Sequence, residues 1–578
     1  MSVAQYTQKV LANLPCVNGK SLMEFYKEML LKISAMQRLD FLAETIDEQS
    51  DFLPTIDWSN GKNDEKSQQF RYVGNECFTR FEFVEALKWY NKALAHAKSK
   101  ENIGVCYANR SAAYFKLSMF KACMVNVRAA LNYVLSDRLK AKLYQRYVRA
   151  QDELLATGIK PQERNIIELS RPAKGSQPFY INCLSKQRDA IVTSEPLQPG
   201  DVISLEKPYS QILSQSHVYE RCTYCLTNKA YLSMIPCPNC SSAMFCSGVC
   251  YKMAMKVFHH FECPMIDGLY NFLPDSMYLG LRTVFTSFHE CNWSMDDYQN
   301  RIIMCFGDET EPFDVNVTEP GETANEKVFL MIHNMTRSFN FSMEQHVAVV
   351  VVAEKLKSLF GSLFNRDAIT AIMFSVSIFH MIQVSQEHGV LLEETAFSGD
   401  GVGNDITTYG CGMFPFASNF KLSCAPNVLL LNNNGTLIGF AMTKINRNEP
   451  IELGLMSRNH FLTDMNRRSE RSKTFSGRCC HCTACEEDFE LYTDIQPFDG
   501  RRYSPPIPVI AEKCLKFTEI VRSVKFILYY LNTNRNLPYI SREVGWCIQA
   551  MIQLLRQLVQ AYDTDLMFTE YSRLIRND

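Results

Sequence analysis

The chain has 578 residues, of which 46% are hydrophobic and 21% are charged, and its formal net charge at pH 7 is −2. This length predicts several structural units, and the composition is that of a globular protein. With so small a net charge, we expect no specific or sequence-independent binding of nucleic acid.

The N-terminus, the apolar runs and the cysteines predict the compartment. Met1–Val10 lacks the basic and then apolar pattern of a secretory signal. The longest apolar runs, Val347–Ala353 and Ala371–Val384, are too short or too interrupted by polar residues to cross a membrane, so we expect core helices there. The 22 cysteines then belong to a reducing compartment, where clustered cysteines bind metal. We expect a cytoplasmic or nuclear location, or both, with no membrane contact.

Residues 1–65 are expected to form a helical leader, and residues 66–160 contain a repeat of small and aromatic residues. The first copy contains Gly74, Phe83, Ala86, Tyr90 and Ala93, and the second contains Ser111, Tyr114, Phe120, Cys123 and Ala130. The displacement is 37 residues from Gly74 to Ser111. The layout resembles the tetratricopeptide repeat (TPR), whose period is about 34 residues. A plain helical bundle with chance small residues is the alternative.

Five polar residues in this repeat region suggest a binding site: Arg71, Asn75, Asn109, Lys142 and Arg146. Residues four apart share one face of a helix, as Arg71 and Asn75 do, and also Lys142 and Arg146. The set resembles the dicarboxylate clamp of co-chaperone TPR domains, with Arg71 where lysine is usual. That resemblance implies binding of chaperone C-terminal tails ending in Glu-Glu-Val-Asp. A solvated polar face is the alternative.

Residues 170–220 are expected to form short strands, because their apolar runs are bounded by turns such as Gln198–Asp201. Residues 221–265 then carry eight metal-type ligands in four close pairs. The pairs are Cys222 and Cys225, Cys237 and Cys240, Cys246 and Cys250, and His259 and Cys263. Such thiolate and imidazole pairs suit tetrahedral zinc, and eight ligands complete two sites with no open position, which indicates structural zinc. His260 is the neighbouring alternative to His259, and ordinary buried or disulfide-bonded cysteines are the alternative to zinc.

The order of these pairs resembles a MYND finger. In that family the first and third pairs bind one zinc, and the second and fourth pairs bind the other. Metal binding of about 10–16 kcal/mol per site can replace the hydrophobic core that so short a segment lacks. The resemblance implies a protein-interaction module for proline-containing peptides.

Residues 266–400 are expected to form a helical insert, and residues 401–475 return to strands such as Thr436–Ala441. Residues 476–490 hold a compact cluster of three thiols, Cys480, Cys482 and Cys485, which needs a fourth ligand. Residues 491–578 form an amphipathic helical tail. The predicted fold is therefore α+β and multidomain.

From about Phe179 to Asp578 this arrangement resembles the SET-and-MYND (SMYD) family. There a SET β-fold is split by a MYND finger and a helical insert, and is followed by a zinc-binding post-SET segment and a TPR-like helical domain. The helical front points to the TPR-bearing, fourth-member branch. The resemblance implies Cys424 as the fourth post-SET ligand, and so about three zinc ions per chain.

The same resemblance implies transfer of methyl groups from S-adenosylmethionine (SAM) to protein lysines, but the expected motifs are replaced. The glycine turn reads Lys186, Gln187, Arg188 and Asp189; the Asn-His pair reads Lys421 and Leu422; and the upstream asparagine aligns with Gln386. Leu455 stands at the expected catalytic tyrosine, so no catalytic residue is assigned. Loss of one acid/base group costs about 10²–10⁴ in rate, and SAM binding is doubtful.

Two functions follow. The first is an interaction scaffold or regulator, which recruits proteins through the TPR and MYND segments and has lost methyl transfer. The second is an active SAM-dependent protein-lysine methyltransferase with a rearranged pocket. Because function resides in the site rather than in the fold, we favour the scaffold, and the enzyme question stays open.

Overall fold

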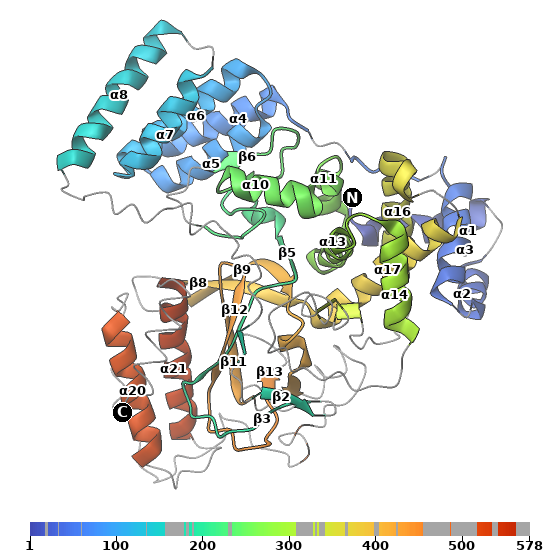
Figure 1. Cartoon of the computed structure of the whole chain (residues 1–578). Coiled ribbons are helices and arrows are strands. Elements are labelled where there is room, and N and C mark those ends of the chain that lie inside the picture. Colours follow the sequence, from blue (N-terminus) through green and yellow to red (C-terminus); the bar gives the residue numbers. More distant parts are fainter. Residues whose placement is uncertain are drawn as a thin grey trace. The chain divides into compact units, whose positions relative to one another are not determined.

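The structure is a computed structural model of the whole chain (Figure 1). It describes all residues except 18–20, 33, 52, 59–60, 134–135, 157–178, 181–183, 188–189, 229–233, 308–327, 330–331, 334–341, 365–367, 398–403, 424–425, 455–481, 483–485, 487–516, 534–541 and 562–578. The chain divides into two compact units. We call them the helical unit (Met1–Lys174, Gln211–Asn300 and Asn340–Gln386) and the sheet unit (Gly175–Ser210, Arg301–Phe339 and Glu387–Asp578).

The helical unit begins with three helices that are capped at their N-termini. They are α1 (Val3–Val17), α2 (Leu22–Leu31) and α3 (Ala35–Glu48). Ser21 and Ser34 each form a capping box with the residue three positions on, which satisfies backbone donors at the start of α2 and α3. Helices α1 and α3 both pack against α16 (Met343–Phe364), so the leader belongs to the same core as the later helices.

Five further helices form antiparallel hairpins: α4 (Asp64–Thr79), α5 (Phe83–His96), α6 (Lys100–Lys116), α7 (Phe120–Leu131) and α8 (Asp137–Ala156). Gly74 allows α4 to approach α5, because a Cβ there would lie 2.6 Å from a ring carbon of Tyr90. The corresponding residue of the second hairpin, Ser111, is fully buried. The helical part of the repeat prediction is therefore confirmed, and a shared core joins α4 to α8.

The finger and the later helices complete the helical unit. The finger contains β6 (Ile235–Pro236), β7 (Met244–Phe245), α10 (Gly248–Ala254), a π-helical turn η2 (Met255–His259) and α11 (His260–Glu262), and it follows the short turn η1 (Gln215–His217). The later helices are α12 (Ile266–Phe272), α13 (Asp275–Glu290), α16 and α17 (Ala368–His388), while α14 (Met295–Gly307) begins in this unit and continues past its boundary at Asn300. Val347–Ala353 and Ala371–Val384 lie in α16 and α17 as expected, and no helix among the described residues is long and apolar enough to span a membrane.

Among the described residues, the sheet unit contains a six-stranded sheet in the order β1-β4-β12-β11-β13-β10. These strands are β1 (Phe179–Tyr180), β4 (Val202–Glu206), β10 (Lys421–Ser423), β11 (Val428–Asn433), β12 (Thr436–Ala441) and β13 (Glu452–Gly454). Asn434 and Gly435 join β11 to β12 with φ of 48° and 80°, as a type I′ hairpin turn requires. Helices α20 (Phe517–Thr533) and α21 (Arg542–Ala561) pack on this sheet through one apolar core.

Two hairpins complete the described strands of the sheet unit. The first pairs β2 (Leu184–Gln187) with β3 (Ala190–Thr193), and the second pairs β8 (Val390–Phe397) with β9 (Asn404–Met413). Strand β5 (Ser210–Leu213) lies where the two units meet in the sequence, and the turn η3 (Ala417–Asn419) precedes β10. The turn expected at Gln198–Asp201 is present, with Gly200 at a φ of 86°.

One boundary prediction is wrong. The helical insert expected over residues 266–400 ends at His388, and Val390–Phe397 is strand β8. The physical reason is pairing: β8 is antiparallel to β9 along its whole length, from Val390 opposite Gly412 to Phe397 opposite Asn404. Partners that lie seven to 22 residues downstream leave no signal within the segment itself.

Candidate functional site

The finger brings its eight predicted ligands into two groups of four. Cys222, Cys225, Cys246 and Cys250 form the first group, and Cys237, Cys240, His259 and Cys263 form the second. The ligand atoms within each group lie within 4.8 Å of one another. All eight residues are buried except Cys225, which is partly exposed. The interleaved pairing that the MYND resemblance implied is therefore what the fold produces.

The distances within both groups fit tetrahedral zinc. A Zn–S bond of about 2.3 Å places two tetrahedral sulfurs about 3.8 Å apart. In the first group Sγ of Cys246 lies 3.6 Å from that of Cys225 and 3.4 Å from that of Cys250. In the second group Sγ of Cys237 lies 3.7 Å from that of Cys263. The two groups could therefore each hold one structural zinc ion.

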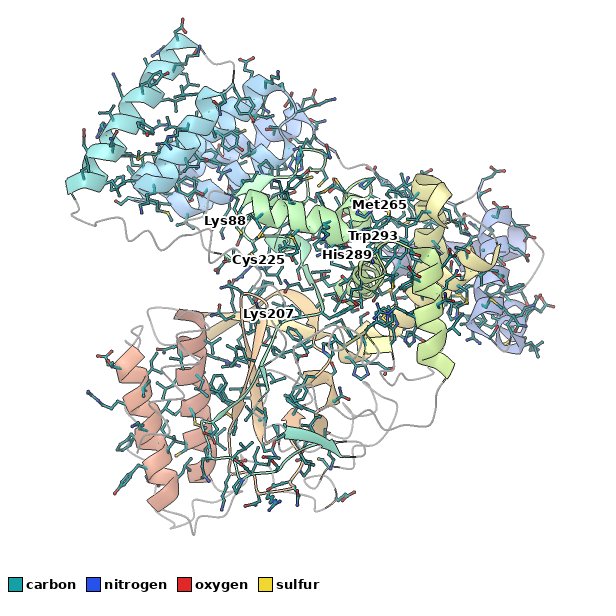
Figure 2. The ribbon with its side chains drawn as sticks, in the orientation of Figure 1. Lys88, Lys207, Cys225, Met265, His289 and Trp293 are labelled. Carbon is teal, nitrogen blue, oxygen red and sulfur yellow. The ribbon has the colours of Figure 1, made fainter. Side chains whose placement is uncertain are left out.

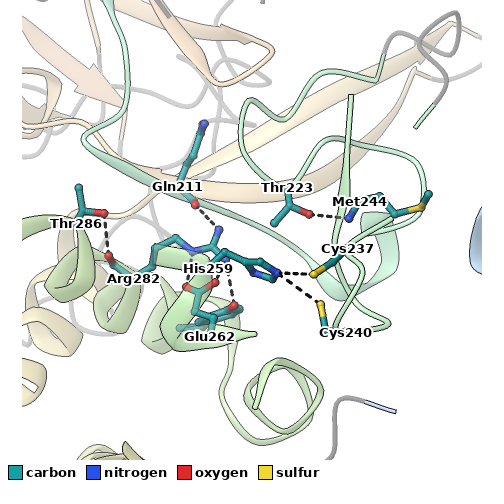
Figure 3. A network of polar contacts seen from close by, with 10 residues as sticks. Gln211, Thr223, Cys237, Cys240, Met244, His259, Glu262, Arg282 and Thr286 are labelled. Carbon is teal, nitrogen blue, oxygen red and sulfur yellow. Dashed lines mark hydrogen bonds and ion pairs between the residues drawn. The ribbon is translucent and has the colours of Figure 1, made fainter. Parts of the chain in front are cut away.

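His259, not His260, completes the second group (Figure 3). The Nε2 atom of His259 lies 3.4 Å from Sγ of Cys237 and 3.6 Å from Sγ of Cys240. The turn η2 ends at His259 and so directs that ring inward. His260 instead donates from Nδ1 to the Met255 carbonyl oxygen at 3.2 Å, and its ring packs edge-on against Trp293. The histidine that the ligand spacing favoured, His259, is therefore the one that lies in the group of potential ligands.

A buried ion pair ties the finger to helix α13 (Figure 3). Glu262 accepts from the Arg282 guanidinium at 2.7 and 2.6 Å, and both side chains are almost completely buried. Arg282 also donates to the Gln211 carbonyl oxygen at 2.8 Å, and its guanidinium lies 4.1 Å from the centre of the Phe258 ring. The sequence analysis missed this pair, although Arg282 is the only charged residue in the apolar stretch from Met277 to Phe285.

The third predicted zinc site lies mostly outside the described residues. Of its four ligands only Cys482 is described, and its side chain is buried. Cys424, Cys480 and Cys485 belong to the part of the chain that the structure does not describe. The third zinc ion stays a prediction.

The helical hairpins bring the two predicted clamp amides into contact. Asn109 in α6 donates from Nδ2 to Oδ1 of Asn75 in α4 at 2.9 Å. The same Oδ1 accepts from the Tyr90 hydroxyl at 2.9 Å, so Tyr90 fixes the orientation of Asn75. Burial raises the pKa of Tyr90 to about 12, and the phenol therefore stays a donor at neutral pH.

The three predicted cations of the clamp occupy different environments. Arg146 in α8 donates from Nη1 to the Ala108 carbonyl oxygen at 2.9 Å and to the Ser111 hydroxyl at 2.7 Å, on either side of Asn109. Lys142, one turn earlier in α8, is exposed. Arg71 is partly exposed, but its Nε is buried and has no hydrogen-bond partner among the described residues. An unpartnered buried donor favours an acceptor supplied by a ligand.

The predicted SAM-pocket residues are only partly described. Lys186 and Gln187 end β2, opposite Ile191 and Ala190. Lys421 is exposed in β10, where its Nζ lies 3.4 Å from a Glu452 carboxylate oxygen, and Leu422 follows it in the same strand. Gln386 is an exposed residue of α17 in the helical unit, and its Oε1 accepts from Gln345 at 2.5 Å. Arg188 and Leu455 lie outside the described residues.

Comparison with known proteins gives several relatives, and no protein-family model matches the chain. The chain is 26% identical over 230 residues to protein-lysine N-methyltransferase SMYD4 of Danio rerio, a match that covers 35% of this chain and 30% of the relative. It is 23% identical over 485 residues to protein-lysine N-methyltransferase SMYD4 of Gallus gallus, which covers 64% of this chain and 65% of the relative. It is also 28% identical over 139 residues to the Hsp70/Hsp90 co-chaperone cns1 of Schizosaccharomyces pombe, covering 24% of this chain and 38% of the relative.

Proposed function

Because the chain is related to the SMYD family of SET- and MYND-domain proteins, we propose that it is a zinc-dependent protein-interaction scaffold. Its helical repeats, taken as TPR units, bind the free C-terminus of a partner chain, and its finger binds proline-containing peptides. Its SET-like sheet unit carries no methyl transfer. The proposal places the protein in the cytoplasm, the nucleus or both.

The contact between the Asn75 and Asn109 amides carries this proposal. Two amides that meet between two helices, with Arg146 bonded to the backbone of the same turn, form a polar site larger than packing of α4 against α6 requires. The unpartnered Arg71 Nε adds a donor near Asn75. Two amides and three cations suit a ligand with two carboxylates, such as a terminal carboxylate followed by an acidic side chain.

The chemistry of the site favours chaperone tails that end in Glu-Glu-Val-Asp. Asn75 and Asn109 would hold the terminal carboxylate, while Lys142 and Arg146 would neutralise an acidic side chain. Hydrogen bonds to charged groups contribute about 1.5–3 kcal/mol each. The match to a protein named an Hsp70/Hsp90 co-chaperone supports this class of partner.

Paired lysine variants test the clamp. Lys142→Ala should weaken binding of a Glu-Glu-Val-Asp peptide about tenfold or more, since it removes one charge-assisted contact. Lys140→Ala is the matched control, because Lys140 lies in the same helix but pairs with Asp137 at 3.7 Å. Isothermal titration calorimetry measures both affinities. Equal affinities for the two variants would mean that the five residues are only a solvated face.

The loss of methyl transfer rests on residue chemistry at the cofactor positions. Lys421 and Leu422 lie in β10, which pairs with β13, at the position where the family has asparagine and histidine. Lys421 forms an ion pair with Glu452. Neither residue supplies the amide and imidazole groups that hold the cofactor. Lys186, Gln187 and Arg188 replace the glycine turn, and any residue other than glycine allows a less close approach of a ligand to its backbone.

An active protein-lysine methyltransferase is the second candidate, and the printed names of the SMYD4 relatives favour it. The two functions differ in cofactor binding. Calorimetric titration with SAM should show no binding if the scaffold proposal holds. Micromolar SAM binding, or transfer of a labelled methyl group that a pocket variant abolishes, would establish the enzyme instead.

A further inference from the structure

The finger and helix α5 are joined by the segment that precedes the first zinc ligand. Asn91 in α5 donates from Nδ2 to the Tyr219 carbonyl oxygen at 2.9 Å. The Lys92 ammonium lies 5.6 Å from the centre of the Tyr219 ring, and the His96 ring lies 5.9 Å from it. Tyr219 is also hydrogen-bonded to Ser242, two residues after the zinc ligand Cys240. A short chain of contacts therefore connects the second ligand group to α5.

A second contact connects the finger to helix α6. Arg110 is fully buried, and its Nη1 donates to the Met234 carbonyl oxygen at 2.9 Å, just before strand β6. The guanidinium lies near the Tyr107 and Tyr114 rings, 5.6 and 5.9 Å from their centres. A fully buried guanidinium needs its acceptors, because a lost partner leaves a charge with neither solvent nor a hydrogen bond.

In the sequence, Arg110 lies between two residues that form hydrogen bonds within the clamp region. Asn109 precedes Arg110 and contacts Asn75, while Ser111 follows it and accepts from Arg146. The finger therefore contacts α6 at the turn that aligns α4 with α8. An ion pair between Lys88 of α5 and Glu220, 3.4 Å apart, adds a further contact next to Tyr219 in the sequence (Figure 2 labels Lys88).

We propose that zinc binding in the finger controls the affinity of the helical groove for its carboxylate ligand. The proposal rests on the clamp function above and adds its regulation. Small zinc sites couple metal binding to folding, so loss of zinc disorganises Tyr219 and Met234 as acceptors. Arg110 must then move toward water, which shifts Asn109 and Ser111 with it. Coupling between two sites is reciprocal, so peptide binding also strengthens zinc retention.

Ligand variants of the full-length chain test this coupling. Cys240→Ser and Cys250→Ser each damage one finger site without touching the groove. We expect each variant to bind a Glu-Glu-Val-Asp peptide at least tenfold more weakly than the zinc-loaded parent chain. Cys291→Ser is the matched control, because Cys291 is a buried cysteine of the same unit that belongs to neither ligand group. It should bind like the parent chain.

Hydrogen exchange of the parent chain gives a readout that needs no variant and no peptide. Chelation should speed amide exchange in α5 and α6, the two helices that contact the finger. Arg110→Met removes the need for the Met234 acceptor, so its peptide affinity should change less with zinc than that of the parent chain.

The two proposals fail in different ways. Equal peptide affinity with and without finger zinc, together with unchanged exchange in α6, would overturn the coupling and leave the clamp intact. If the zinc-loaded parent chain binds no peptide, the clamp is wrong, and the exchange of α6 upon chelation then decides by itself whether the finger braces the helices.

Discussion

Arg282 and Glu206 show how the stability of this protein depends on the partners of a few buried ionisable side chains. Arg282 pairs with Glu262 beside the second zinc group, and Glu206 in β4 accepts hydrogen bonds from the backbone amides of Phe416 and Ala417 at 2.8 and 3.0 Å. All three side chains are almost completely buried. Each therefore depends on one or two specific partners.

We expect Arg282→Ala to lower the free energy of unfolding of the helical unit by about 3–5 kcal/mol, because Glu262 is left as an uncompensated buried charge. A double variant, Arg282→Met with Glu262→Leu, should recover most of that loss, since neither charge remains. Denaturant unfolding followed by tryptophan fluorescence measures both, because Trp293 packs 5.0 Å from Phe261, next to Glu262. Equal losses in the single and double variants would contradict the ion-pair account.

Because Glu206 is buried, we expect the stability of the sheet unit to depend on pH. Burial raises the pKa of Glu206 from 4.5 to about 7, while the two backbone amides oppose the rise. The folded state therefore binds the proton more tightly than the unfolded state between pH 4.5 and 7. The stability from this group is complete below the unfolded pKa and is lost as the pH rises through the folded pKa. Glu206→Gln should flatten this slope in thermal unfolding between these two pH values, and an unchanged slope would contradict the burial effect.

For single residues, the sequence predicts the role of those whose chemistry depends on their spacing along the chain. The eight finger ligands are fixed by two- to four-residue intervals, and the choice of His259 over His260 follows from the same interval. Arg110, Glu206 and Arg282 carry no such interval, because each finds its partner through the tertiary fold. The partners of Arg110 and Glu206 are backbone groups, a carbonyl oxygen for Arg110 and two amides for Glu206, and the sequence does not distinguish such groups.

The two helical hairpins end their first helices with the same turn. Phe81 after α4 and Ser118 after α6 have φ of 65° and 57°, and they are 37 residues apart, as Gly74 and Ser111 are. In both turns the amide of the next residue bonds the carbonyl oxygen five residues back: Glu82 to Cys77 and Met119 to Tyr114. This is a Schellman motif, in which glycine is usual at the left-handed position.

Ser118→Gly should therefore raise the free energy of unfolding by up to about 1 kcal/mol, because glycine avoids the steric cost of the left-handed conformation. Lys116→Gly, two residues earlier and inside α6, should instead lower it by about 0.5–1 kcal/mol. Differential scanning calorimetry of the two variants compares the signs. Destabilisation by both substitutions would show that the left-handed conformation at Ser118 is not strained.

Elements with a strong local pattern are the ones that the sequence predicts. The amphipathic helices of the repeats and the strand at Thr436–Ala441 each lie where expected. Strand β8 was missed because its only structural signal is its pairing with β9, beyond residues 398–403. The packing of the finger on α5 and α6 was likewise unpredictable, since it depends on carbonyl groups of Tyr219 and Met234.

For the whole molecule we expect about three zinc ions per chain. The two finger groups account for two, and Cys424, Cys480, Cys482 and Cys485 account for the third. Elemental analysis of freshly purified protein should lose about one zinc ion per chain in Cys424→Ser, while the two finger ions remain. A parent chain with one zinc ion or none would contradict the finger assignment.

The most direct test of the scaffold proposal is calorimetric titration of the full-length chain with two peptides that end in Glu-Glu-Val-Asp. One peptide has a free C-terminal carboxylate, and the other is amidated there. We predict that the free acid binds and that the amidated peptide does not, because Asn75 and Asn109 meet where a terminal carboxylate would accept from both. Equal affinity for the two peptides, or no binding of either, would contradict the account.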